Sequence, residues 1–170
     1  MEQDLERRYF RVCANISLDA IRDNIKKGRE LLEPETRLMA VVKADAYGHG
    51  AVPVAQAIDD LVDAYAVAIP EEGAELRQAG ITKPVLVLGY TAPELAASAI
   101  RQDIMLSVFQ SETAEAYGKI AKELGATAKV HIKLDTGMSR IGYLCNEQSL
   151  ADIERIAKLP DIKIEGMFTH

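Results

Sequence analysis

Short apolar runs alternate with helical patterns along almost the whole chain, and this alternation limits the possible folds most strongly. Runs of strand length occupy residues 38–43, 64–69, 84–89, 104–108, 129–135 and 162–170. Apolar residues at helical spacing fill the segments 17–33, 50–61, 70–80, 91–102, 111–126 and 149–159. Strands separated by helices predict β-α-β crossovers and therefore a parallel sheet.

Two parallel architectures compete, an open doubly wound sheet and a closed (β/α)8 barrel. An open sheet that binds a dinucleotide carries a glycine-rich GxGxxG turn after an early strand. The loop after residues 38–43 has glycines only at Gly48 and Gly50, which favours the barrel. A complete barrel needs typically about 250 residues. We therefore expect the 170 residues to be the N-terminal part of a barrel, with about six β-α units and the remaining strands outside this chain.

Individual residues predict where some helices begin and which face they bury. Thr91 and Glu94 have the spacing of a capping box, and Pro93 fits the first turn of that helix. In the first helical segment, the spacing of the apolar residues predicts one buried face. These residues are Leu18, Ile21, Ile25 and Leu32.

Composition excludes several classes of protein. The formal net charge is −6, and no cluster of lysine and arginine forms the basic stripe of a nucleic-acid-binding protein. No window has the length and apolarity of a membrane span, and the N-terminus lacks the apolar core of a signal peptide. Cys13 and Cys145 lie too far apart in sequence for a metal-binding pair. These features indicate a cytoplasmic protein with reduced thiols, without a metal site and without a nucleic-acid or membrane partner.

The stretch VVKADAYGHG places a lysine at the end of an apolar strand. Lys43 would lie at the carboxyl end of the first strand, which is where barrel enzymes carry their chemistry. A lysine there can form a Schiff base, although a lysine that merely reaches the surface gives the same pattern. Tyr47 follows in the same loop and could donate a hydrogen bond to an anion, whereas His49 is expected to pack or cap.

Two later stretches also put polar residues at strand ends. In KLDTGMSRIG, Arg140 follows a strand and suits bidentate recognition of a carboxylate or phosphate. Lys133 lies on that strand and shares a face with His131, which we interpret as structural. In EGMFTH, His170 ends the last strand and could stack on a flat aromatic ligand.

Together these stretches resemble the alanine racemases, which use pyridoxal 5′-phosphate. VVKADAYGHG is similar to the cofactor-lysine signature of that family, and KLDTGMSRIG and EGMFTH are similar to its next two motifs, in the expected order. The resemblance covers essentially the whole chain but only the first part of the family's length. Ser139 stands where a glycine is common.

The resemblance implies a role for each residue. Lys43 would hold the cofactor covalently and act as one of two acid/base groups. Tyr47 would contact the phosphate, His170 the pyridine ring, and Arg140 both the phenolic oxygen and the substrate carboxylate. Lys133 corresponds to a lysine that is often carbamylated. The second base would be a tyrosine of the partner subunit in a homodimer, from a C-terminal β domain that this chain lacks.

Other functions share part of these signals. A non-catalytic pyridoxal-phosphate-binding protein and a barrel-class decarboxylase both carry motifs similar to VVKA. A racemase for serine or another amino acid would share nearly all of them. A folding or structural domain without activity is a further alternative.

Overall fold

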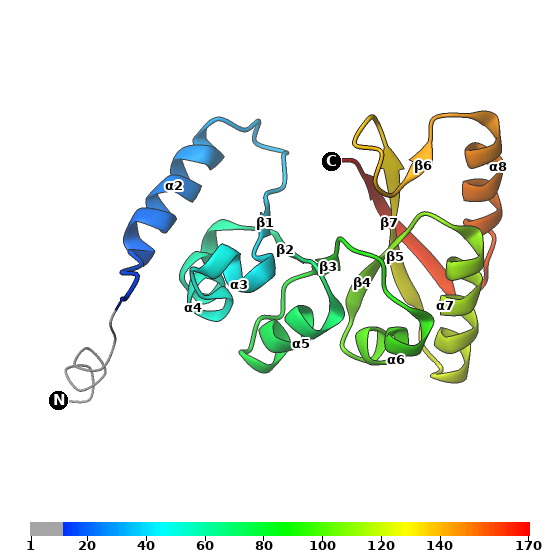
Figure 1. Cartoon of the computed structure of the whole chain (residues 1–170), viewed down its shortest axis with the longest axis horizontal. Helices are drawn as coiled ribbons and strands as arrows, with labels where there is room; N and C mark the ends of the chain where they lie inside the picture. Colours follow the sequence, from blue (N-terminus) through cyan, green and yellow to red (C-terminus); the bar gives the residue numbers. More distant parts are fainter. Residues whose placement is uncertain (1–11) are drawn as a thin grey trace.

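The computed structural model describes residues 12–170 as one curved parallel sheet with helices along its outer side (Figure 1). The strands are β1 (Met39–Val41), β2 (Ala64–Val67), β3 (Val85–Val87), β4 (Ile104–Val108), β5 (Ala128–Asp135), β6 (Tyr143–Leu144) and β7 (Ile162–Phe168). The helices are α2 (Leu18–Glu30), α4 (Ala51–Ile58), α5 (Pro70–Gln78), α6 (Pro93–Arg101), α7 (Ser111–Glu123) and α8 (Glu147–Ile156). A short helical segment, α3 (Lys43–Gly48), follows β1, and a 3₁₀ turn, η1 (Asp59–Leu61), follows α4.

The strand order identifies the fold as part of a barrel. Strands β1 to β5 pair in sequence order and in parallel, and β7 then pairs in parallel with β5. A doubly wound sheet reverses its strand order and carries helices on both faces. Here α4 to α8 follow one another around the outside of the curve (Figure 1). The prediction of an incomplete (β/α)8 barrel is confirmed.

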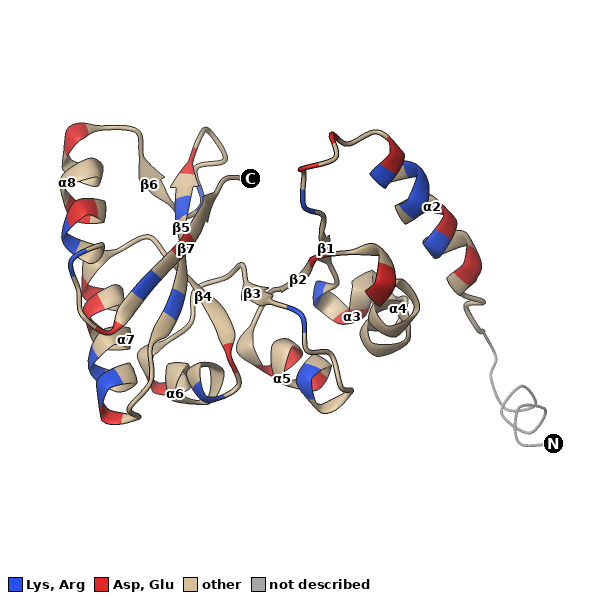
Figure 2. Ribbon diagram, turned by 180° about the vertical axis from the view of Figure 1, so that it is seen from behind, with Lys and Arg blue, Asp and Glu red and all other residues tan. Residues whose placement is uncertain are grey.

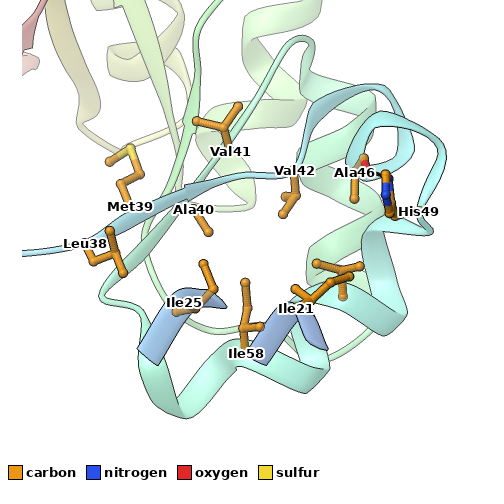
Figure 3. Close-up of a pocket in the computed structure, with 11 residues that line it drawn as sticks. Ile21, Ile25, Leu38, Met39, Ala40, Val41, Val42, Ala46, His49 and Ile58 are labelled. Atoms are coloured by element: carbon orange, nitrogen blue, oxygen red, sulfur yellow. Dashed lines mark hydrogen bonds between the residues drawn. The ribbon is translucent and has the colours of Figure 1, made fainter. Parts of the chain in front are cut away.

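The strand register divides the side chains into an inner and an outer set. Paired residues of parallel strands point to the same face, and neighbours along a strand alternate. Met39, Val41, Ala64, Ala66, Leu86, Met105, Ser107 and His131 belong to the inner set. On β1, Ala40 and Val42 point toward the helices whereas Met39 and Val41 point away from them (Figure 3).

The main core lies between the outer face of the sheet and the helices. Tyr65 and Tyr117 are the largest fully buried side chains. Both are satisfied, because the Tyr65 hydroxyl donates to the carbonyl of Ala55 over 2.8 Å and the Tyr117 hydroxyl donates to the carbonyl of Thr91. Burial raises the pKa of both phenols, so they stay neutral hydrogen-bond donors.

Helix α2 packs on this core through a half-buried face. Leu18, Ile21 and Ile25 contact the core as predicted, but the helix ends at Glu30, so Leu32 lies beyond it. The guanidinium of Arg22 forms a bidentate pair with Asp60, with nitrogen–oxygen distances of 2.6 and 2.9 Å. This pair ties α2 to the turn after α4.

Two local predictions were incomplete or wrong. Helix α6 begins with Ala92 at its N-cap and has no side-chain cap. The hydroxyl of Thr91 is buried without a partner among residues 12–170, because Thr91 lies one residue before the cap. The short strand β6, which pairs with Leu134 and Asp135, was not expected, since the segment before it looks like a loop.

Acidic and basic segments are mixed along the helices (Figure 2). Among residues 12–170, no helix is both long and apolar enough to cross a membrane. The mixture of both signs along the described helices agrees with the net charge of −6.

We expect replacement of Gly142 by alanine to destabilise the protein. Gly142 has φ +133°, and a Cβ there would lie 2.6 Å from the backbone nitrogen of Asp135. The free energy of unfolding should fall by about 1–3 kcal/mol, measured by urea denaturation. Gly118→Ala is the matched control: a Cβ in helix α7 meets only Ile162, at 3.5 Å, so stability should rise by about 0.5–1 kcal/mol. Equal effects of the two substitutions would contradict the backbone path around Gly142.

We also expect stability to fall as the pH is lowered below about 6.5, the usual pKa of histidine. Burial lowers the pKa of His131, with only partial opposition from the charge of Glu165. The unfolded chain then binds a proton that the folded chain does not, so unfolding becomes easier in acid. Urea denaturation between pH 7 and pH 5 measures this slope. His131→Leu should flatten it, whereas substitution of the exposed His170 by glutamine should leave it unchanged.

Candidate active site

Lys43 lies just after β1, at the carboxyl edge of the sheet. The backbone N–H of Val42 still donates to the carbonyl of Ala66 over 2.9 Å, so the parallel pairing reaches the residue before Lys43. Val42 then leaves the extended conformation, with φ −117° and ψ 20°, and Lys43 begins α3 with a half-buried side chain. The lysine is therefore delivered to the carboxyl edge of the sheet, as predicted from the sequence.

An unusual backbone turn follows the lysine. Residues 44–47 all have positive φ angles, between 50° and 55°, although none of them is glycine. Left-handed backbone costs about 1–2 kcal/mol per non-glycine residue, so four in succession require strong local support. Strain of this kind concentrates at functional sites. This turn was not predicted from the sequence, because alanine, aspartate and tyrosine rarely adopt left-handed backbone.

Hydrogen bonds from both ends hold the turn. Within it, the N–H of Ala46 donates to the carbonyl of Val42 over 2.9 Å. The carboxylate of Asp45 accepts from the N–H of Ala51 over 2.6 Å, at the first residue of α4. The carboxylate of Glu72 accepts from the N–H of Ala44 over 2.8 Å. The turn is thus fixed to two helices.

Tyr47 ends the turn close to the lysine. Its side chain is 62 % exposed, and the Lys43 Nζ lies 5.8 Å from the centre of its ring. His49 packs against the turn instead, with Nδ1 2.9 Å from the carbonyl oxygen of Ala46. The expected packing role of His49 is confirmed.

Lys133 is a buried cation on the inner face of β5. Only 3 % of it is exposed, and its Nζ donates to the carbonyl of Leu134 over 2.6 Å. The Nζ lies 5.3 Å from the centre of the Phe168 ring. His131 shares this face, as predicted, with its ring 6.4 Å from that of Phe168. Among residues 12–170, Lys133 forms no ion pair with a carboxylate, so a buried charge here calls for an anion.

The loop after β5 carries Arg140. Asp135 organises the loop as a turn, because its carboxylate accepts from the N–H groups of Ser139 and Gly137, each over 3.0 Å. These two bonds hold the pKa of Asp135 below its usual range. Ser139 has φ +56°, a conformation that favours glycine. Arg140 is exposed, and no ion pair joins it to another described residue.

The end of β7 lies against this loop. The hydroxyl groups of Thr136 and Thr169 are hydrogen-bonded to each other, and His170 follows Thr169 as an exposed residue. The structure therefore brings the predicted residues together in two groups. Lys43 and Tyr47 form one, while Lys133 and the loop of Arg140 lie beside the strand end that carries His170. No hydrogen bond or ion pair between described residues joins the two groups.

An apolar pocket of about 310 Å³ lies behind β1, between β1, α2 and α4 (Figure 3). Ile21, Ile25 and Ile58 point into it from the helices (Figure 3). His49 is the one polar side chain that lines it. This pocket lies on the helix side of β1, and its apolar lining does not suit an anion.

The residues at the carboxyl edge fit pyridoxal phosphate. The aldehyde group of this cofactor attaches covalently to an amine. Lys43 provides the amine, beside the exposed phenol of Tyr47. At the other end of the edge, the exposed guanidinium of Arg140 suits an anionic group. Sequence reasoning missed one further residue, Glu72. A helix-start glutamate is common, and only the fold brings it to the lysine turn.

Comparison with known proteins identifies the family of the chain. Residues 16–170 match the family described as alanine racemase, N-terminal domain. The alanine racemase of Methanococcus maripaludis is 46% identical over 160 residues, which are 94% of this chain and 43% of that protein. The alanine racemase of Clostridium novyi is 45% identical, over 94% of this chain and 41% of that protein.

Solved structures show the same likeness. An alanine racemase of Clostridium difficile superposes with a TM-score of 0.88 and 49% identity, over 90% of this chain and 40% of that one. A histidine racemase of Leuconostoc mesenteroides superposes with a TM-score of 0.82 and 29% identity, over 91% of this chain and 42% of that one. The chain thus spans about two fifths of the length of these relatives. It belongs to the alanine racemase N-terminal domain family.

Proposed function

We propose that this chain is the cofactor-binding part of an alanine racemase, which interconverts L-alanine and D-alanine with pyridoxal 5′-phosphate and so supplies D-alanine for peptidoglycan. The observation that carries the proposal is Lys43 at the carboxyl edge of the sheet, held beside Tyr47 by a strained turn. The family match over residues 16–170 supports it.

Each residue has a distinct task in this proposal. Lys43 would hold the cofactor through its aldehyde end, and the lysine amine would also move a proton at the α-carbon of the substrate. Tyr47 donates a hydrogen bond to the phosphate, and His170 packs against the pyridine ring. Arg140 pairs with the substrate carboxylate and the phenolic oxygen. When bound, the cofactor withdraws negative charge from the α-carbon.

Lys133 has a supporting role in the proposal. Its amine is buried and bonded to a carbonyl oxygen. Carbamylation would convert this buried cation into an anion, which could then pair with Arg140. A charge of that sign would orient the guanidinium toward the substrate.

The whole protein extends beyond this chain in our proposal. The relatives are more than twice as long as the segment matched here, which supports further barrel strands and a C-terminal β domain. We propose a cytoplasmic homodimer in which the partner subunit supplies a tyrosine as the second base.

A racemase for a different amino acid is the second candidate. The structural likeness to a histidine racemase indicates that the same barrel serves more than one substrate. Serine belongs to this alternative. A non-catalytic pyridoxal-phosphate-binding protein and a barrel-class decarboxylase stay open as well, and product analysis separates them, since a decarboxylase releases carbon dioxide.

We expect pyridoxal phosphate to react with Lys43 in preference to other lysines. Borohydride reduction followed by peptide mass mapping should find the pyridoxyl group on the peptide that contains Lys43. Lys43→Arg should abolish this adduct because a guanidinium does not form the linkage. Lys129→Arg is the matched control: Lys129 pairs with Asp103 over 2.6 Å at the other end of β5, so its loss should leave labelling unchanged. Labelling scattered over surface lysines would contradict the assignment of Lys43.

We also expect the 170-residue chain alone not to racemise alanine. The proposal assigns the second base to a segment outside this chain, and loss of one acid/base group costs roughly 10²–10⁴-fold in rate. Circular dichroism of L-alanine solutions incubated with the chain and pyridoxal phosphate measures the reaction. Turnover that depends on Lys43 would show that both proton-transfer groups lie within these residues.

A further inference from the structure

The carboxylate of Glu72 joins the ends of two neighbouring strands. Its Oε1 accepts a hydrogen bond from the N–H of Ala44 over 2.8 Å. Its Oε2 accepts from the N–H of Ala68 over 2.6 Å. Ala44 directly follows Lys43, and Ala68 directly follows β2. Both oxygens of one half-buried side chain are thus used to hold backbone at the carboxyl edge of the sheet.

Helix capping explains only one of these two bonds. Glu72 is the third residue of α5, and a glutamate there commonly reaches back to an N–H just before the helix. The bond to Ala68 resembles that pattern, one residue before the N-cap Ile69. The bond to Ala44 does not, because Ala44 belongs to the preceding β-α unit. A residue that served only to start α5 would have no need of this contact.

The backbone at Ala68 is itself held by the neighbouring strand. Its carbonyl accepts from the N–H of Gly89, just after β3, over 3.2 Å. A Cβ at Gly89 would lie 2.6 Å from that same oxygen, so the close approach of the two strand ends requires glycine. Glu72 therefore ties Ala44 to backbone that β3 already holds in place.

Ala44 is the point at which the lysine turn needs such a tie. It is the first of the four left-handed residues, and Asp45 secures only the far side of the turn, at Ala51. Without Glu72, the N–H of Ala44 would lose its bond, and the left-handed conformation would lose support next to Lys43. The lysine would then sample other directions.

We propose that Glu72 is a positioning residue for Lys43. It fixes the backbone after the lysine and so restricts the directions in which the amine can point at the carboxyl edge of the sheet. The inference rests on the proposed function for the part that concerns cofactor binding, but the contact with Ala44 stands without it.

The test compares three variants of the 170-residue chain. Glu72→Gln keeps the size of the side chain but places an NH₂ group against one of the two N–H donors. It also removes the negative charge that strengthens the bond to the other donor, so both bonds are weakened. Glu71→Gln is the matched control, because Glu71 is exposed and also lies in the first turn of α5, so the same charge is lost from the same helix end. Tyr117→Phe removes a buried hydrogen bond far from the turn and controls for general destabilisation.

Two measurements are made on each variant, well below its unfolding temperature. Amide hydrogen exchange reports on the N–H groups of Ala44 and Ala68. Borohydride trapping with pyridoxal phosphate gives the rate of labelling at Lys43. In Glu72→Gln we expect both amides to exchange about tenfold faster and Lys43 labelling to slow about tenfold, the size of one lost charge-assisted hydrogen bond. Glu71→Gln and Tyr117→Phe should match the wild type in both.

The outcomes separate the two proposals. Unchanged labelling of Lys43 in Glu72→Gln, with wild-type labelling present, would overturn the positioning role. Unchanged exchange at Ala44 would overturn the contact itself. If the wild type is not labelled at Lys43 but Glu72→Gln still accelerates exchange at both amides, the proposed function fails while the tie between the strand ends stands. Should Glu72→Gln fail to fold, Glu72→Asp, which is too short to reach both N–H groups, takes its place with the same expectations.

Discussion

Parallel pairing of consecutive strands is the constraint on which the rest of this structure depends. Because β1 to β5 and β7 all run in one direction, their carboxyl ends meet at one edge. Polar residues that are far apart in sequence, such as Lys43, Lys133 and Arg140, are thereby gathered there. Helices α4 to α8 pack against the outer face of the sheet, where the main apolar core lies. The core on the outer face and the candidate site at the carboxyl edge therefore belong to the same sheet.

The site combines a rigid sheet with a strained connection. The strands need little specific support, because their ladders and the packed outer face hold them. The turn after Lys43 is different, since four left-handed residues are stable only while the surrounding hydrogen bonds persist. Asp45 supplies one support from within the turn, and Glu72 supplies another from α5. The turn after Lys43 is thus stabilised by hydrogen bonds, whereas the strands are stabilised mainly by apolar packing.

Much of this arrangement could be predicted from the sequence, for physical reasons. Apolar runs bounded by helical patterns marked each long strand, and the lysine at the end of the first run was visible as an exception. The left-handed turn could not be predicted, because its residues have no preference for it. Strand β6 has only two residues, too few for a pattern. The Thr91–Glu94 spacing predicted a side-chain cap that α6 does not have. The helix begins one residue later than this spacing implies, with Ala92 at its N-cap. Glu72 was invisible as a site residue, because its partner Ala44 lies 28 positions away.

The irregularity between β5 and β7 has a consequence for the last residues of the chain. Ile162 and Ile164 pair with Ala128 and Val130, on the helix side, but after the register shift Gly166 and Phe168 pair with His131 and Lys133, on the inner side. One extra residue thus exchanges the two faces of β7 halfway along its length. Phe168 reaches the Lys133 amine only because of this exchange. Deletion of a single residue from the middle of β7 would reverse which side chains at the end of the strand face the inner side. Over evolution, selection should therefore remove insertions and deletions in this short stretch more strongly than substitutions.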